Sequence, residues 1–333
     1  MISVLYNNGK QQIYLDEIVT SVTWSGDIMQ ASRKLEVDLS NTVNGRTRAI
    51  DIEQGKEIRF FNGKKELFRG VIFADDINAR GQHRLVAYDE NIYLTRNKDT
   101  RIFKNMTASQ IVKRLCNDFR IKMGKIDDTK YVIPKLILRD KTLWEMMIIA
   151  LTVTQKSTGR RFFICSKEGK LQLLARKEQT VQWVLENGVN IIDANYSQNI
   201  EELRNQVKVI GGDEKKAPVI ATVKNDKLIK SFGLMQHLEN VDSKMKKSQM
   251  EQLAKQLLKE LGTIDDEASL ECLGIDDVIA GTGVYVKESM THIIGGYYVS
   301  TDSHRFSQGS YTMSLNLSAT DELPKMEYEE ESK

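Results

Sequence analysis

The sequence predicts a mainly β, α+β protein in which two barrel-like antiparallel β domains flank a mixed α+β module. Strand patterns fill residues 1–95 and return after Ile200, and two capped helix patterns lie between them. At 333 residues, the chain is longer than one compact core usually allows. We expect four segments: an N-terminal β domain (1–95), an α+β module (96–195), a second β domain with an inserted helix at 243–261 (196–322), and an acidic flexible tail (323–333).

The N-terminal segment reads as a series of hairpins. The pair Asn62-Gly63, which favours a tight hairpin turn, separates strand-like runs at 57–61 and 66–72. Asn7 to Lys10 separate a similar pair at 2–6 and 11–15. Leu35, Val37 and Leu39 alternate with charged residues, as in a strand with one solvated face. We expect no helix before residue 95, and therefore an antiparallel barrel or sandwich.

The middle segment contains two helix starts. Thr107 and Gln110 have the spacing of a capping box ahead of an amphipathic helix that reaches Phe119. Thr142 and Glu145 repeat this spacing ahead of a run, 146–151, that is apolar on all sides and should be buried. Gly159 ends that helix, and a hairpin follows with strands at 161–165 and 171–174.

Strand patterns return in the C-terminal third. Runs at 206–210, 219–223 and 228–234 precede a long helix from Ser243 to Leu261, which carries one apolar stripe and stops at Gly262. Its lysines lie off the stripe, so we interpret them as a solvated face. Further strands are expected at 269–273, 284–287, 293–301 and 310–318.

The composition bounds the class of protein. The net charge is +2, from 48 basic and 46 acidic residues, and this balance gives no global attraction to nucleic acid or membrane. The three cysteines are far apart and lie mostly in apolar runs, which indicates reduced thiols and synthesis in a cytoplasm. The first ten residues lack the pattern of a signal peptide, and no apolar run is long enough for a membrane span.

No residue pattern predicts catalysis, a cofactor or a metal. The four histidines are scattered without metal-ligand spacing, and no nucleophile motif accompanies His304, which we interpret as structural. Gly281-Thr282-Gly283 precedes a strand rather than a helix and is expected to be a turn. Acidic pairs could serve a glycosidase, but neighbouring strand residues point to opposite faces, and all of these pairs look like turn or helix-end residues: 75–76, 127–128, 265–266 and 276–277.

Three stretches carry a resemblance to a known family. They are 140–171, beginning Asp140-Lys141-Thr142-Leu143-Trp144; 203–209, Leu-Arg-Asn-Gln-Val-Lys-Val; and 295–315, beginning Gly295-Gly296-Tyr297-Tyr298. Together with the order of the segments, they resemble the baseplate hub proteins of contractile phage tails, in particular the PBSX-type prophage group. The similarity covers nearly the whole chain, and the last stretch is the most specific.

The resemblance implies a non-enzymatic homotrimer in a virion or a phage-tail-like bacteriocin. Two tube-like β domains per chain would make a pseudo-sixfold ring that joins a hexameric tail tube to a trimeric spike, with baseplate wedge and tape-measure proteins as further partners. Candidate structural or interface residues are Trp144, Phe162, Phe163, Asn205, His304, Phe306 and Met313. The alternative is a tail-associated protein that binds or hydrolyses peptidoglycan, because the helix, loop and strand after Met106 are also similar to a LysM-type module. A further alternative is an unrelated cytosolic adaptor with two β domains.

Overall fold

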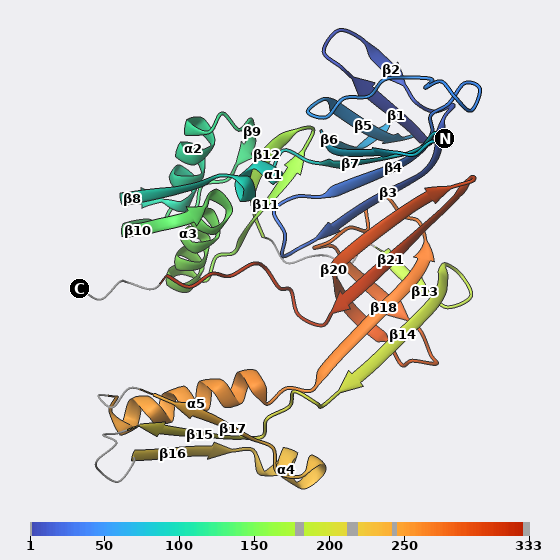
Figure 1. The fold of residues 1–333 in the computed structure, drawn as a ribbon. Coiled ribbons are helices and arrows are strands. Elements are labelled where there is room, and N and C mark those ends of the chain that lie inside the picture. The colour runs from blue at the N-terminus through green and yellow to red at the C-terminus, as the bar shows by residue number, and fades with distance from the viewer. Residues whose placement is uncertain (1, 177–182, 212–218, 242–244, 329–333) are drawn as a thin grey trace. The chain divides into compact units, whose positions relative to one another are not determined.

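A computed structural model describes residues 2–176, 183–211, 219–241 and 245–328 (Figure 1). The fold is mainly β and of the α+β class, as the sequence predicts. By its contacts the chain divides into two compact units. The first comprises Met1–Ala194 with Ser269–Lys333, and the second comprises Asn195–Ala268. This division differs from the four predicted segments because residues distant in the chain share one sheet.

Thirteen strands of the described residues form that sheet, in the order β14-β18-β21-β20-β3-β4-β7-β6-β5-β1-β2, with β13 and β19 branching from β20. The strands are β1 (Ile2–Asn7), β2 (Gln12–Tyr14), β3 (Val19–Asp27), β4 (Lys34–Ser40), β5 (Glu57–Asn62), β6 (Lys65–Ile77), β7 (Gln82–Tyr88), β13 (Trp183–Glu186), β14 (Ile191–Asn199), β18 (Asp265–Leu273), β19 (Gly283–Lys287), β20 (Ile294–Ser307) and β21 (Ser310–Ser318).

The sheet is continuous through β20 and is not closed, so the prediction of two separate barrels is wrong. The C-terminal half of β20 pairs with β3, and its N-terminal half pairs with β19. The change of partner follows an irregularity between Val299 and Thr301. Alternating apolar residues predicted the strands themselves, but partners so distant in the chain leave no local signal. We call the β3–β20 pairing the seam.

The predicted N-terminal hairpins are confirmed. β1 pairs with β2, and β5 pairs with β6 with Asn62 opposite Lys65. The two turn residues are therefore Gly63 and Lys64, one position later than the predicted pair, and the φ of 58° at Gly63 suits glycine. Alternate residues of β4, namely Leu35, Val37 and Leu39, lie in the core beneath these strands. Phe306 of β20 belongs to the same core, so the seam is packed as well as hydrogen-bonded.

The middle module contains three helices and two small sheets. The helices are α1 (Ile92–Arg96), α2 (Ala108–Asp118) and α3 (Leu143–Thr158). The strands are β8 (Lys98–Thr107), β9 (Met123–Ile126), β10 (Val132–Thr142), β11 (Phe162–Lys167) and β12 (Lys170–Ala175). β8 pairs with β10, and β12 pairs with both β9 and β11. α1 begins within the segment in which no helix was expected, because its five residues are too few to show a period.

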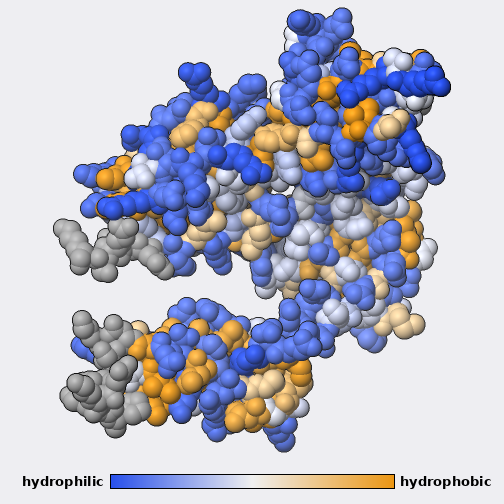
Figure 2. Space-filling view, viewed as in Figure 1, coloured by the Kyte–Doolittle hydropathy of each residue, from blue (hydrophilic) through white to orange (hydrophobic). Residues whose placement is uncertain are grey.

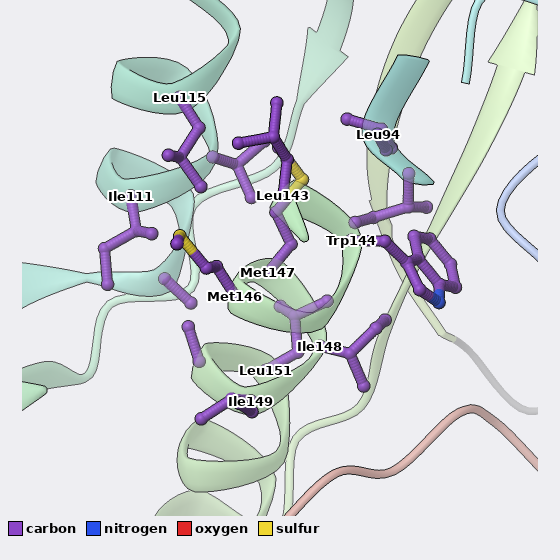
Figure 3. Packing of buried hydrophobic residues seen from close by; sticks show 14 of the residues in the cluster. Leu94, Ile111, Leu115, Leu143, Trp144, Met146, Met147, Ile148, Ile149 and Leu151 are labelled. Atoms are coloured by element: carbon purple, nitrogen blue, oxygen red, sulfur yellow. The ribbon is translucent and has the colours of Figure 1, made fainter. Parts of the chain in front are cut away.

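Both predicted capping boxes are confirmed. Thr142 accepts a hydrogen bond from the backbone of Glu145, whose carboxylate accepts one from the backbone of Thr142, and Thr107 and Gln110 do the same at α2. Gly159 ends α3 with a φ of 71°. α3 is buried on several sides, because Trp144 projects from one side of the helix and Met146 from the opposite side (Figure 3). One apolar core therefore surrounds the helix.

The first part of the predicted flexible tail is ordered against this core. The side chain of Leu323 is buried, and the backbone N–H of Met326 donates to Thr152 Oγ1 at 3.1 Å. The hydroxyl of Tyr328 accepts a hydrogen bond from the N–H of Ile137 in β10 at 3.2 Å. Acidic composition hid these apolar anchors, so the prediction of a flexible tail is wrong for residues 323–328. Residues 329–333 lie outside the described residues.

The second unit contains a sheet in the order β16-β15-β17. Its elements are β15 (Gln206–Gly211), β16 (Val219–Lys224), α4 (Asp226–Phe232), β17 (Gln236–Asn240) and α5 (Lys247–Leu261). α5 packs on β15 and β16 through Met250 and Ala254, so the inserted helix belongs to this unit. Part of its predicted start, Ser243 and Lys244, lies outside the described residues.

One predicted strand in this unit is a helix. Residues 228–234 were expected to follow a turn at Asn225, but Asn225 caps α4 by accepting hydrogen bonds from the backbone of Lys227 and Leu228. Asparagine favours both turns and helix caps, so the local sequence did not separate the two outcomes.

Candidate functional site

A network of buried and half-buried polar side chains lies at the seam. We call it the seam cluster, and it consists of Trp24, Arg33, Asp89, Asp302, His304 and Tyr311. Trp24 comes from β3, Arg33 directly precedes β4, and Asp89 follows β7. Asp302 and His304 lie two residues apart on β20, so both point to the same side of the strand.

Asp302 is the centre of the cluster. Its carboxylate accepts hydrogen bonds from both terminal nitrogens of Arg33, and the distance from Nη1 to Oδ1 is 2.9 Å. It also accepts the backbone N–H of Ala280 at 2.6 Å. The guanidinium of Arg33 lies over the ring of Trp24, 4.2 Å from its centroid. A buried carboxylate paired in this bidentate way fixes β20 relative to β3 and β4.

His304 is fully enclosed. Its Nε2 lies 3.0 Å from the carbonyl oxygen of Val278 and 3.3 Å from Asp302 Oδ2. Its Nδ1 lies 3.0 Å from the hydroxyl of Tyr311 on β21. The imidazole also packs against Trp24, with ring centroids 5.1 Å apart. Both ring nitrogens therefore have protein partners.

Electrostatics at the cluster follow burial and pairing. Burial alone would raise the pKa of Asp302, but the charge of Arg33 and the hydrogen bonds from His304 and Arg33 together hold that pKa below its ordinary value. Burial raises the pKa of the Tyr311 hydroxyl, and the neighbouring carboxylate of Asp276 raises it further. The result is a fixed ion pair beside a neutral phenol.

Asp89 extends the cluster toward the middle module. Its carboxylate accepts the backbone N–H groups of Arg33 and Asn91 at 3.0 Å each. Burial raises the pKa of Asp89 to about 7, although these two hydrogen bonds lower it. Arg33 is thus held at its backbone by Asp89 and at its guanidinium by Asp302.

The chemistry open to this arrangement is structural. A histidine beside an aspartate can act as a general base only when one ring nitrogen reaches a substrate. Here His304 has no exposed surface, and the carbonyl of Val278 and the hydroxyl of Tyr311 occupy its nitrogens. Two of the acidic pairs serve similar purposes: Asp276 accepts a hydrogen bond from the side chain of Asn62, and Asp127 accepts one from the N–H of Ala175. The pairs 75–76 and 265–266 lie in β6 and β18, so the prediction of turn or helix-end positions is wrong for them. The site is suited to holding strands in register.

A second charged cluster joins the middle module to the segment after β21. Asp321 accepts hydrogen bonds from Arg161 Nη1 at 2.9 Å and from Arg176 Nη2 at 2.7 Å. Arg176 also donates to the carbonyl of Gly281 at 2.6 Å, and its guanidinium lies 5.4 Å from the ring centroid of Phe163. Gly281 lies in the predicted turn before β19, so this cluster ties the hairpin of the module to that turn.

The structure places the seven predicted candidate residues in three locations. His304, Phe306 and Met313 come together, with His304 directly opposite Met313 and Phe306 in the sheet core. Trp144 and Phe162 lie in the core of the middle module, and Phe163 contacts Arg176. Asn205 is buried in the second unit, where its side chain donates to Gly233 and accepts from Met235.

Sequence reasoning missed the ion pair at the centre of the cluster. Arg33 and Asp302 are 269 residues apart in the chain, and neither lies in a motif that indicates an ion pair. Asp302 stood inside the most specific stretch of the family resemblance, which was the one available signal. Arg33 carried no signal in a single sequence.

Comparisons with known proteins agree with this fold. A family model described as YQBQ-like matches residues 22–318. Two Bacillus subtilis (strain 168) proteins are each 31% identical: YqbQ, over 95% of this chain and 96% of its own length, and the phage-like element PBSX protein XkdQ, over 95% and 97%. The similarity to XkdQ confirms the predicted resemblance to the PBSX-type group.

Solved structures show the same fold at low identity. The 43 kDa tail protein of prophage MuSo2 from Shewanella oneidensis has a TM-score of 0.71 at 13% identity, over 95% of this chain and 97% of that one. A tail protein from Neisseria meningitidis MC58 has a TM-score of 0.66 at 14% identity, over 95% and 96%. The type VI secretion component c3393 of Escherichia coli, similar to phage T4 gp27 and gp5, has a TM-score of 0.55 at 9% identity, over 98% and 77%.

Proposed function

Because this chain belongs to the YQBQ-like family, we propose that it is the structural hub of a contractile-tail baseplate, a homotrimer that joins a hexameric tail tube to a trimeric spike. Its kinship with XkdQ and its tail-protein fold support the coarser description, a structural protein of phage tail and baseplate type. The hub role, the trimer and the partners are the proposal.

The seam is the observation that carries it. Each chain supplies two groups of strands, one from β1 to β7 and one from β13, β14 and β18 to β21, which are joined by the hydrogen-bonded β3–β20 pair. Three chains would supply six such groups. A hub that matches a hexameric ring to a trimeric one needs this doubling, and it needs the two groups held at a fixed relation.

The open ends of the sheet support assembly. β14, at one end of the strand order, is nine residues long and largely exposed. Its central residues from Ile192 to Gln198 include one charged side chain, Asp193, and no proline. Soluble proteins usually protect such an edge, so an unprotected one is suited to pairing with another chain.

The proposed work is mechanical rather than enzymatic. The buried His304 and the carboxylates paired at Asp302 and Asp321 hold strands and segments in place. Force transmitted along the tail would pass through the continuous sheet and through subunit contacts.

The test measures mass and partners. Light scattering on the purified chain should give three times the 38.0 kDa of one chain. The trimer should then bind the tube protein and the spike protein encoded beside it, each in a separate sizing experiment. Purified cell wall should neither sediment with the protein nor clear in a turbidity assay. Clearing of the wall would replace this proposal with the peptidoglycan hydrolase reading.

A further inference from the structure

Charge is distributed unevenly along the chain. Residues 92–142, which form α1, α2 and β8 to β10, contain 13 lysines and arginines and five aspartates and glutamates, a net charge of +8. The whole chain carries +2, so the remainder carries −6. Such an asymmetry creates a local positive potential that attracts an acidic surface.

The β8–β10 ribbon presents part of this charge on its outer face. Phe103 and Leu136, which are paired across the ribbon, point inward to the core. The alternate positions point outward, where Ile102 opposes Ile137 and Lys104 opposes Lys135. We call these four residues the ribbon face. Figure 2 shows hydrophilic and hydrophobic side chains mixed over this part of the module.

The two lysines of the ribbon face repel each other. Like charges directly opposite each other on a sheet destabilise it. Within the described ranges, neither Lys104 nor Lys135 forms an ion pair, and both side chains are exposed. Ile102 is 54% exposed beside them. An acidic surface with aliphatic side chains would relieve the repulsion and cover the isoleucine.

A surface of that kind exists on the same chain. On β18, Leu270 and Cys272 are buried, whereas Glu271 and Leu273 are exposed. Ile192 on the adjacent strand β14 is 53% exposed. We call Ile192, Glu271 and Leu273 the acidic face, after its one carboxylate, that of Glu271. Within the first unit, the ribbon and this end of β18 lie far apart (Figure 1), so one chain does not bring its own two faces together.

We propose that the ribbon face of one copy docks on the acidic face of the next copy, with Lys104 and Lys135 directed at Glu271 and the aliphatic residues packed between them. Aliphatic side chains favour a protein partner over nucleic acid, whose bases would stack on aromatic groups absent from this face. A contact between two different faces is heterologous, and repeated by rotation it closes a ring. The inference rests on the proposed trimer and names the surfaces that build it.

Charge reversal tests the contact. The variant Lys104→Glu/Lys135→Glu places acidic groups against Glu271, and such juxtaposition costs several kcal/mol, so trimer dissociation should become easier by roughly a hundredfold in protein concentration. Sedimentation velocity over a dilution series measures this shift. The control Lys113→Glu/Lys255→Glu removes the same charge from exposed sites off the ribbon face and should leave the trimer intact.

Rescue separates the contact from misfolding. Glu271→Lys alone places a positive charge against Lys104 and Lys135, so it should also promote dissociation of the trimer, to a smaller degree than the double reversal. All three substitutions together should restore the trimer. A trimer that is unchanged by the reversals would overturn this inference and leave the proposed hub trimer standing. A wild-type chain that is monomeric at every concentration would instead overturn the trimer, and this inference with it.

Disulfide formation between two introduced cysteines tests the contact directly. Ile102→Cys and Ile192→Cys are made in separate chains, mixed, and oxidised. A disulfide-linked dimer that requires both variants supports the contact. Dimers that form equally well in either variant alone, or from the three native cysteines, contradict it.

Discussion

Around α3 the buried side chains are mostly aliphatic or aromatic, whereas the seam buries Asp302 and His304 against the guanidinium of Arg33. The two regions belong to the same unit. An apolar core tolerates exchange of one hydrophobic side chain for another of similar volume. A buried ion pair demands one geometry, and losing either partner leaves a charge uncompensated. The packing of the module therefore contributes mainly stability. The ion pair at the seam also fixes the position of one strand group relative to the other.

The largest effect is expected from a substitution that breaks the ion pair at the seam. Asp302→Ala removes the acceptor of Arg33, His304 and the Ala280 N–H together and leaves a half-buried guanidinium without its partner. We expect a loss of about 3–5 kcal/mol in the free energy of unfolding, measured by urea denaturation. Asp277→Ala, which removes an exposed partner of Lys65, should cost less than about 1 kcal/mol. Equal losses in the two variants would show that burial of the pair is not what matters.

A slightly smaller effect should follow from opening the apolar core. Trp144 is 7% exposed, and Trp144→Ala leaves a cavity beside α3, so we expect a loss of about 3 kcal/mol and a lower yield of trimer. Trp144→Phe should retain most of the stability, because an apolar core accepts a smaller aromatic ring better than a void. If the alanine variant kept wild-type stability and wild-type yield of the proposed trimer, packing around Trp144 would not be what stabilises the module.

The pH dependence sharpens the contrast, because among the described residues the carboxyl groups whose pKa is raised by burial are Asp89 of the seam cluster and its neighbour Glu90. Asp89 has a folded-state pKa of about 7, above its ordinary 3.8. Between these values the folded protein holds a proton that the unfolded chain has released, so this group makes the free energy of unfolding fall as pH rises, by about 1 kcal/mol per pH unit. Asp89→Asn should flatten that slope between pH 4.5 and 6.5, within the window that the two pKa values set. An unchanged slope in urea titrations would exclude Asp89 as its source.

The smallest expected effect concerns the start of α3. Thr142→Ala removes the hydroxyl that accepts the N–H of Glu145 at 3.1 Å, and we expect a loss of about 1 kcal/mol. Thr142→Ser keeps the acceptor and should stay close to wild type. Thermal melts of the three proteins would resolve the difference, and a serine variant as unstable as the alanine variant would point to packing of the methyl group instead.

How far the sequence predicted each region follows from the range of its contacts. The capping boxes at Thr107 and Thr142, the end of α3 at Gly159 and the hairpin at Asn62 depend on neighbours within a few residues, and all are confirmed. The family resemblance was also visible. Long-range features were not visible in the sequence. No pattern connects Arg33 to Asp302 or β3 to β20, so the open, continuous sheet was mistaken for two barrels.

Intermediate cases show where local rules compete. Asn225 suits a turn and a helix cap equally well, and the structure uses the cap. Residues 323–328 were grouped with the acidic tail, yet Met326 and Tyr328 anchor them to the module. In the second case tertiary contacts that the local sequence does not encode decided the outcome.

The seam also constrains when the protein can finish folding. β3 is made early in synthesis, and its partner in β20 follows with Arg33 and Asp302 separated by 269 residues. At typical rates of chain elongation this interval lasts roughly 15–50 s, far longer than a hairpin needs to form. Throughout that time the strands from β1 to β7 would carry an unpaired edge at β3. Newly made chains are thus exposed to pairing with the wrong neighbour on the same polysome, and an assembly of several copies would have to wait until each chain had closed its own seam.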